Sequence, residues 1–210
     1  MPRLDGLINK VNEFPGTTGY NQALALFLGQ LLDRAKWGKQ NPEDSAEIAA
    51  LHRALERGHI PYHEIVRSVE ILGAAGHKAA TSLVVGLLGK ADWAFRHVAV
   101  RVLTWHWKLR QYADECVRML KQDNSAEVRE AAAAGLGALF AKSRDHAFGR
   151  ILAEAASKQS EDRMVQEAAY LALEKIDGRD SREMSGLIEF SFPEDADDEL
   201  IRSYLGKPRE

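Results

Sequence analysis

The sequence predicts an all-α fold, a right-handed α-solenoid of stacked antiparallel helix pairs. The first observation is a repeat: segments of nearly the same pattern begin at Phe95, Val128 and Val165, at intervals of 33 and 37 residues. A period in this range is typical of stacked repeat arrays. The second observation is that residues 62–192 contain no Pro and are dominated by good helix formers such as Ala, Leu and Glu.

The repeated segments place residues of one kind at the same steps. They run over Phe95–Thr104, Val128–Gly137 and Val165–Glu174. Each opens with an apolar residue, usually followed by Arg, and then has a small residue four places on and Leu eight places on. Residues at these steps share one face of a helix, so each segment is predicted to be the second helix of a pair.

Apolar periodicity and punctuation place the other helices. Pro42 and Pro61 lie near predicted first turns, and Asp92 and Ser125 are candidate N-caps. From residue 78 onward the helices alternate, because the first of each pair ends in a bulky apolar cluster and the second carries the repeated segment. The predicted helices cover residues 20–37, 43–57, 61–74, 78–89, 92–107, 109–121, 125–141, 144–157 and 161–177.

The chain divides into three predicted parts. Residues 1–42 form an N-terminal helical cap, residues 43–178 form the repeat array, and residues 179–210 form an acidic tail. Residues 189–199 contain six carboxylates and no Lys or Arg, with large apolar residues on both sides. Two interpretations stay open, a flexible acidic tail and a strap that folds back over the last repeat.

The repeated segments resemble the HEAT repeat family, in particular its short bacterial units. The resemblance covers about residues 60–178 and is strongest over 128–137. It implies the solenoid fold and a concave surface for binding, and it says little about function. The other segments depart from the pattern at Phe95, Thr104, Gln166 and Glu174.

Composition narrows the class of protein. The 210-residue chain has a net charge of −3, which argues against a dedicated nucleic-acid binder. Its single Cys116 excludes an intramolecular disulfide. We expect no membrane helix, because no run of 18 apolar residues occurs. The start of the chain lacks the apolar core of a secretory signal, so a cytoplasmic location is expected.

The predicted helix 92–107 is unusual for what it carries outside its core stripe. At 100° per residue, the core face holds Phe95, Val98, Ala99, Val102, Leu103 and His106. The opposite side holds Trp93, His97, Val100, Arg101, Thr104, Trp107 and Lys108. Trp and Arg are favoured at binding hot spots.

Equivalent positions in neighbouring repeats extend this side into a stripe. The predicted partner-binding residues are Tyr62, Trp93, His97, Arg101, Trp107, Lys108, Glu130, Glu167 and Tyr170. The alternative is structural, in which Trp93, Val100, Trp107 and Phe140 pack between adjacent second helices. Arg96 and Arg129 are open to both interpretations, and the resemblance implies that they pair with acidic residues between neighbouring units.

Other sites are weaker. His59 and His63 are four residues apart, but Pro61 separates them and no further ligand-rich signature accompanies them. Cys116 is predicted to be a buried structural thiol. No phosphate loop, HExxH or GxSxG motif is present in the sequence, so we expect no metal, no cofactor and no enzymatic activity.

The leading hypothesis is a non-enzymatic protein-binding module that acts as a monomer. The alternative is an enzyme, because some HEAT-like proteins are DNA glycosylases with concave Trp and Asp residues, roles that Trp93, Trp107, Asp92 and Arg101 would take. Phycobilin-lyase relatives give a third hypothesis, in which the concave surface grips a pigment. The acidic chain argues against the glycosylase, since a DNA groove must neutralise several phosphates.

Overall fold

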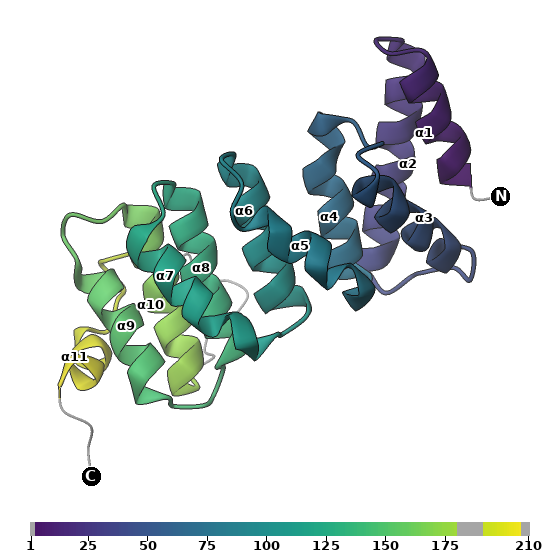
Figure 1. Ribbon diagram of the computed structural model, residues 1–210. Helices are drawn as coiled ribbons and strands as arrows, with labels where there is room; N and C mark the ends of the chain where they lie inside the picture. The colour runs from purple at the N-terminus through teal and green to yellow at the C-terminus, as the bar shows by residue number, and fades with distance from the viewer. Residues whose placement is uncertain (1–2, 180–190, 207–210) are drawn as a thin grey trace. The chain divides into compact units, whose positions relative to one another are not determined.

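A computed structural model describes residues 3–179 and 191–206 of the chain (Figure 1). Within these residues the protein is helical throughout and contains no strand, which confirms the predicted all-α class and its paired helices. The chain divides into two compact units, residues 1–90 and residues 91–210. Each unit is described by itself.

The first unit is built from helices that pack in neighbouring pairs, α1 with α2 and α3 with α4. The predicted N-terminal cap contains one helix that periodicity had not assigned, α1, whose buried Leu4, Ile8 and Val11 face the core. The helices are α1 (Arg3–Glu13), α2 (Thr18–Lys36), α3 (Asp44–Glu56), α4 (Ile65–Ala74) and α5 (Thr81–Leu87). Short 3-10 turns at Tyr62–Glu64 and Lys78–Ala80 precede α4 and α5.

The second unit stacks the repeated segments side by side. Its helices are α6 (Trp93–Arg101), α7 (Ala113–Gln122), α8 (Ala126–Leu139), α9 (His146–Ser157), α10 (Arg163–Asp177) and α11 (Asp198–Leu205). Helix α8 packs against α6, α7 and α10, while α9 packs between α10 and α11 (Figure 1). The helices α6, α8 and α10, here called the motif helices, therefore form one layer, with α7 and α9 in the other.

Side-chain caps begin the motif helices where the sequence predicted them. The Asp92 carboxylate accepts a hydrogen bond from the Ala94 N–H, and the Ser125 hydroxyl accepts one from the Val128 N–H. Helix α10 begins in the same way at Asp162. These caps satisfy N–H groups that the first turn of a helix leaves without a partner.

Two glycines let α8 lie close to both neighbouring motif helices. A Cβ atom on Gly135 would lie 2.6 Å from the Thr104 Oγ1, and one on Gly137 would lie 2.7 Å from the Ala172 Cα. Thr104, predicted to be outside the core, is buried there, and its hydroxyl donates to the Val100 carbonyl at 2.8 Å. The Gly-Leu-Gly sequence of this repeat is therefore a packing feature on both sides.

The helix that starts as α6 does not stay α-helical. Over Val102–His106 it becomes a π-helix, and the Trp107 N–H donates to the Val102 carbonyl five residues earlier. A π turn holds more residues than an α turn. The 100° wheel correctly buries the core stripe from Phe95 to Leu103, but it fails beyond Leu103, and it also placed Val100, which is buried, on the outer side.

Arginines at the start of the motif helices connect neighbouring repeats. Arg96 forms a two-pronged ion pair with Asp123, with nitrogen–oxygen distances of 2.7 and 2.8 Å. Arg129 makes the equivalent contact with Glu161 at 2.7 Å. Both acidic residues precede the next motif helix, so these arginines serve the repeat stack, as the resemblance implied.

Residues with positive φ follow helix α4 and the motif helices α8 and α10. Gly76 follows α4 at 66°, Lys142 follows α8 at 61° and Gly178 follows α10 at 87°. Lys108, at 53°, closes the π segment in the same way. In α10 the Arg179 N–H then donates to the Glu174 carbonyl at 2.9 Å, the bond that ends a helix on a left-handed residue.

Residues 191–206 fold back as a strap over the last repeat. Phe192, Leu200 and Tyr204 are buried, and the Tyr204 ring occupies the space that a side chain on Gly149 of α9 would need. The Arg179 guanidinium holds the Asp197 carboxylate at 2.5 Å. Residues 191–206 of the acidic tail thus lie against the last repeat, while residues 180–190 lie outside the described part of the chain.

Candidate functional site

The outward residues of the motif helices line up in rungs, which together are called the motif face. The repeat intervals of 33 and 37 residues place three residues in each rung. None of the nine is fully buried. The first rung is His97, Glu130 and Glu167; the second is Arg101, Ala134 and Leu171; the third is Trp105, Ala138 and Lys175.

The first rung carries the acidic groups. The His97 Nε2 lies 4.0 Å from the Glu130 Oε2, and the Trp93 ring packs edge-on to the His97 ring with centroids 6.1 Å apart. Burial raises the pKa of the Glu130 carboxyl, although the nearby Arg101 charge opposes the shift. This end of the face therefore combines a half-exposed indole with an imidazole and a partly desolvated carboxyl.

The second rung is hollowed, because α8 has only small residues there. A groove of about 200 Å³ lies between α6 and α8, with Ala131, Ala134 and Gly135 among the residues that line it. His97, Arg101 and Trp105 line the α6 side of the groove. A concave, partly apolar surface with a few polar groups is the usual form of a binding site.

The third rung gathers cations around Trp105. The Lys175 Nζ lies 4.7 Å from the Trp105 ring centroid, and the Lys108 Nζ lies 5.3 Å from it. The Lys108 Nζ also donates to the Ala138 carbonyl at 3.3 Å. Burial lowers the pKa of Lys108, and the like charge of Lys175 lowers it further. Cations over an indole face are attracted by its quadrupole.

Trp107 is a correction to the predicted surface. It is only 2% exposed, whereas Trp105 is 45% exposed. The physical reason is the π segment, whose wider turn rotates Trp107 inward and presents Trp105 in its place. The repeat interval gave a signal for Trp105 that the helical wheel did not, since it aligns this residue with Ala138 and Lys175.

Tyr170 is a second correction. It is 1% exposed because the strap covers it: its hydroxyl accepts a hydrogen bond from the Asp197 N–H at 2.9 Å, and the Phe192 ring lies 6.0 Å away. The equivalent Val100 and Ala133 are buried as well, so this position faces the core in every repeat of the second unit. Tyr170 thus holds the strap and presents no anchor to a partner.

The remaining predicted residues divide between the two units. Trp93, His97, Arg101, Lys108, Glu130 and Glu167 lie on or beside the motif face, and their role in binding stays a prediction. Tyr62 is exposed in the first unit, on the 3-10 turn before α4. Phe140 stacks on Phe148 with centroids 4.0 Å apart, which supports a structural role for that ring.

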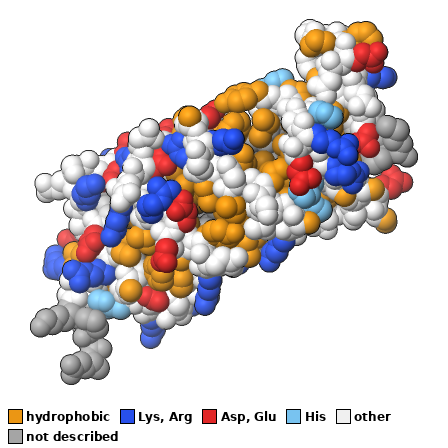
Figure 2. All heavy atoms as spheres, viewed as in Figure 1, with side chains coloured by type: hydrophobic (Ala, Val, Ile, Leu, Met, Phe, Trp, Pro, Cys, Tyr) orange, Lys and Arg blue, Asp and Glu red, His pale blue; other side chains and the backbone are white. Residues whose placement is uncertain are grey.

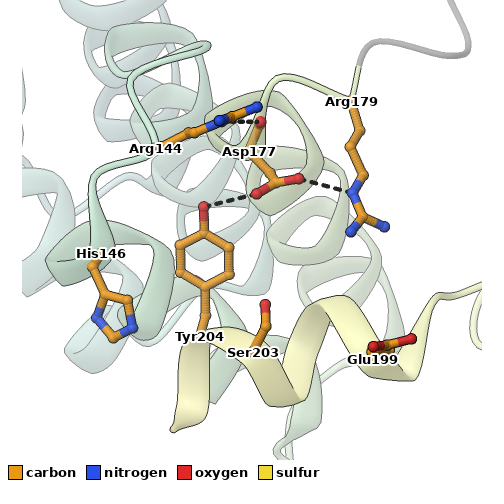
Figure 3. Close-up of a pocket in the computed structure, with 7 residues that line it drawn as sticks. All are labelled: Arg144, His146, Asp177, Arg179, Glu199, Ser203 and Tyr204. Atoms are coloured by element: carbon orange, nitrogen blue, oxygen red, sulfur yellow. Dashed lines mark hydrogen bonds and ion pairs between the residues drawn. The ribbon is translucent and has the colours of Figure 1, made fainter. Parts of the chain in front are cut away.

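A larger cavity of about 660 Å³ lies beneath the strap (Figure 3). It is lined by Arg144, His146, Asp177, Arg179, Glu199, Ser203 and Tyr204. The Tyr204 hydroxyl donates to Asp177 at 3.1 Å, and burial together with the Asp177 charge raises the pKa of Tyr204 to about 12. Asp177 also pairs with Arg179 at 2.8 Å. Tyr204, Asp177 and Arg179 are therefore engaged with one another and help to fasten α11 to α10.

Charge is distributed differently on the opposite layer. On the face seen in Figure 2, Lys and Arg side chains around α9 are interspersed with Asp and Glu. On the motif face, carboxylates belong to the first rung and ammonium groups to the third. The motif face is therefore polarised along the helix axes.

The weaker candidates have simple structural descriptions. Cys116 is buried on α7, and burial raises the pKa of its thiol to about 12. Among the described residues, no cluster of three or more His, Cys, Asp or Glu is placed to hold a metal ion. In the same part of the chain, no helix is both long and apolar enough to cross a membrane.

Comparison with known proteins agrees with this architecture. Residues 80–174, which run from the start of α5 to the last turn of α10, match the family model described as HEAT repeats. No curated protein matches the chain.

Proposed function

We propose that this chain, whose residues 80–174 match the family model described as HEAT repeats, is a non-enzymatic protein-binding module whose motif face holds a segment of a partner protein. HEAT repeats commonly mediate protein interactions. The proposal takes the protein to be a cytoplasmic monomer that needs no cofactor or metal.

One observation carries the proposal. Trp93 and Trp105, each 45% exposed, lie on the α6 helix and its π extension, and Trp105 lines a groove floored by small residues of α8. Exposed aromatic residues beside a groove are costly to leave in water, and they are favoured as anchors at the centre of interfaces. Arg101 lines the same groove and offers directional charged contacts.

The test is affinity capture from extract of the source cells, with mass spectrometry to identify the partner. We expect Trp93→Ala combined with Arg101→Glu to abolish capture, while helical circular dichroism and the melting temperature stay nearly unchanged. Loss of a large aromatic or Arg contact from an interface centre often costs about 2 kcal/mol or more. Reversed charge adds repulsion against an acidic partner.

A matched control removes the same side-chain types elsewhere. Trp37 is 75% exposed on the first unit and Arg150 is exposed on α9, so Trp37→Ala with Arg150→Glu should capture the partner normally. Unfolding of the Trp93/Arg101 variant would show that those side chains are structural. Unchanged affinity in that variant would place the binding surface elsewhere.

The glycosylase alternative loses two of its proposed residues to structural roles. Trp107 is buried, and the Asp92 carboxylate caps α6. We expect labelled duplex DNA to show no saturable binding in a salt titration, because Glu130 and Glu167 lie on the face that DNA would need to approach. Tight binding with a steep salt dependence would favour the alternative.

A further inference from the structure

The polarity of the motif face limits what can lie on it. Along the helices, Glu130 and Glu167 mark the first rung, and Lys175 with Lys108 marks the third. Between them, the second rung offers Ala134 and the partly exposed Leu171, with Arg101 at its α6 side near Glu130. A ligand with one sign of charge along its whole length would meet repulsion at one end of this face.

The two lysines form an unusual pair. Lys108 and Lys175 come from different repeats, yet both ammonium groups lie within 5.3 Å of the Trp105 ring centroid. Across the described residues, neither lysine forms an ion pair with a carboxylate. The Ala138 carbonyl satisfies one donor of Lys108, and the other five ammonium hydrogens of this pair have no hydrogen-bond partner among residues 3–179 and 191–206.

The helix dipole accounts for part of this arrangement. Lys175 lies in the last turn of α10, where a positive charge is favourable. Lys108, however, belongs to neither α8 nor α10, and its ammonium group reaches α8 from the preceding repeat. Dipole stabilisation acts on each lysine separately and gives no reason for the two charges to share one indole.

The length of the face matches a short extended peptide. Rungs one and three are eight residues apart along a helix, which is about 12 Å at the α-helical rise. An extended peptide covers that length in about four residues. Side chains at positions i, i+2 and i+4 of such a peptide point to the same side.

We infer that the motif face binds an extended peptide segment with a basic side chain at i, an apolar side chain at i+2 and a carboxylate at i+4. The carboxylate lies beside Trp105 between Lys108 and Lys175, the apolar side chain enters the groove at Ala134 and Leu171, and the basic group meets Glu130 and Glu167. The inference rests on the proposed function and adds the chemistry of the partner.

The probe is acetyl-Lys-Ala-Leu-Ala-Glu-amide, titrated into the full-length ¹⁵N-labelled protein. Binding is followed at the indole N–H cross-peak of Trp105, which a Trp105→Phe variant identifies. The comparison peptide, acetyl-Gln-Ala-Leu-Ala-Gln-amide, keeps the apolar centre and removes both charges. We expect the charged peptide to shift the peak with a Kd at least threefold lower than that of the neutral peptide.

Variants of Lys175 test the position of the carboxylate. Lys175→Gln should weaken binding of the charged peptide about threefold to fivefold, the range for partly exposed ion pairs. Lys121→Gln, which removes an exposed lysine from α7, is the control and should leave the Kd unchanged. Lys175→Glu should prefer acetyl-Lys-Ala-Leu-Ala-Lys-amide over the original probe, a reversal that altered folding cannot produce.

Several results would overturn the inference. Equal shifts from the charged and neutral peptides would remove the carboxylate requirement, as would an unchanged Kd in Lys175→Gln. Stronger binding of the oligonucleotide dT10 at the Trp105 peak would favour a nucleic acid as the ligand.

Failure of this inference can be told apart from failure of the proposed function. If these peptides fail to bind while Trp93→Ala/Arg101→Glu still abolishes partner capture, the proposed function stands and only the partner chemistry is wrong. If the peptides bind as expected but the Trp93→Ala/Arg101→Glu variant still captures the partner normally, the motif face binds such peptides but is not the surface that holds the cellular partner.

Discussion

At the scale of single residues, Gly137 sets the distance between α8 and α10. We predict that Gly137→Ala destabilises the protein by about 1–3 kcal/mol, because the new methyl group meets the Ala172 backbone 2.7 Å away and overpacks the contact. Gly29→Ala is the control, since a Cβ in the middle of α2 meets nothing within 4 Å. It should gain about 0.5–1 kcal/mol from helix propensity. Urea unfolding measures both, and an equal effect of the two changes would contradict the packing argument.

Ala132 is the second residue at which size matters. It is fully buried on α8, in the core between the helix layers. We predict that Ala132→Leu lowers the thermal midpoint, with a loss of about 1–3 kcal/mol through overpacking. An unchanged midpoint would show that α8 can rotate or shift to admit the larger side chain.

The Arg96–Asp123 pair makes stability depend on pH. Burial alone would raise the pKa of Asp123, but hydrogen bonds from Arg96 and the Ser125 N–H hold it below its usual range. A lowered folded-state pKa contributes stability above the unfolded value of about 3.9, and this contribution is lost as the pH falls through the folded value. Arg96→Gln should therefore cost about 1.5–3 kcal/mol at pH 7, and less as the pH approaches 3.

A matched variant separates this pair from ordinary surface charge. Arg118 pairs with Glu115 on α7, and about half of the Arg118 side chain is exposed (52%). Arg118→Gln should cost less than about 1 kcal/mol at pH 7. Urea unfolding at several pH values gives the comparison, and a loss in Arg96→Gln that does not change with pH would mean that the charge of Asp123 is unimportant.

At the scale of helices, the left-handed residues that follow the motif helices are not all glycine. We predict that Lys142→Gly stabilises the protein by about 1 kcal/mol, because a side chain at φ 61° is strained and glycine is not. Gly178→Ala, at φ 87°, should cost about 1–2 kcal/mol for the same reason. Thermal melts of both variants provide the measurement. Effects of the same sign would contradict the strain argument.

The sequence predicted long periodic helices well and local departures poorly. The predicted helix 161–177 corresponds to α10 at Arg163–Asp177, because its apolar period agrees with the Asp162 cap and the Gly178 stop that the structure shows. Trp107 was misplaced because the spacing of apolar residues does not reveal a π turn. A helical wheel at 100° per residue therefore assigns the wrong face to the residues that follow it. Tyr170 was misplaced because the predicted core stripe left out a position that is buried in each of these repeats, as Val100 and Ala133 show, and the strap, which is distant in sequence, also covers its ring.

At the scale of the whole molecule, stability should follow neighbour contacts. Repeat arrays gain stability from interfaces between adjacent units, so a helix covered on several sides opens least often. We predict that amides of α8, which packs against α6, α7 and α10, exchange with solvent most slowly in the second unit. Amides of the short α11 should exchange fastest among its helices, and hydrogen-exchange mass spectrometry measures both.

A variant of the strap provides the control for the predicted difference in amide exchange between α8 and α11. Leu200 lies on the buried face of α11, so Leu200→Asp should release the strap and speed exchange in α11 while α8 keeps its protection. Uniform protection across the second unit, or equal loss in α8 and α11, would mean that the unit opens as one cooperative block.

The π segment at Val102–His106 has a consequence for how such a surface changes during evolution. The wide turn accommodates one more residue than an α turn, so it acts as a one-residue insertion that the helix absorbs within the turn. Loss of one residue from the turn would restore the α register while the chain after it kept its place, with Trp107 still buried. The segment beside the groove can therefore change length by one residue without moving the helices packed around it, whereas the same change elsewhere in α6 would rotate every following side chain by about 100°.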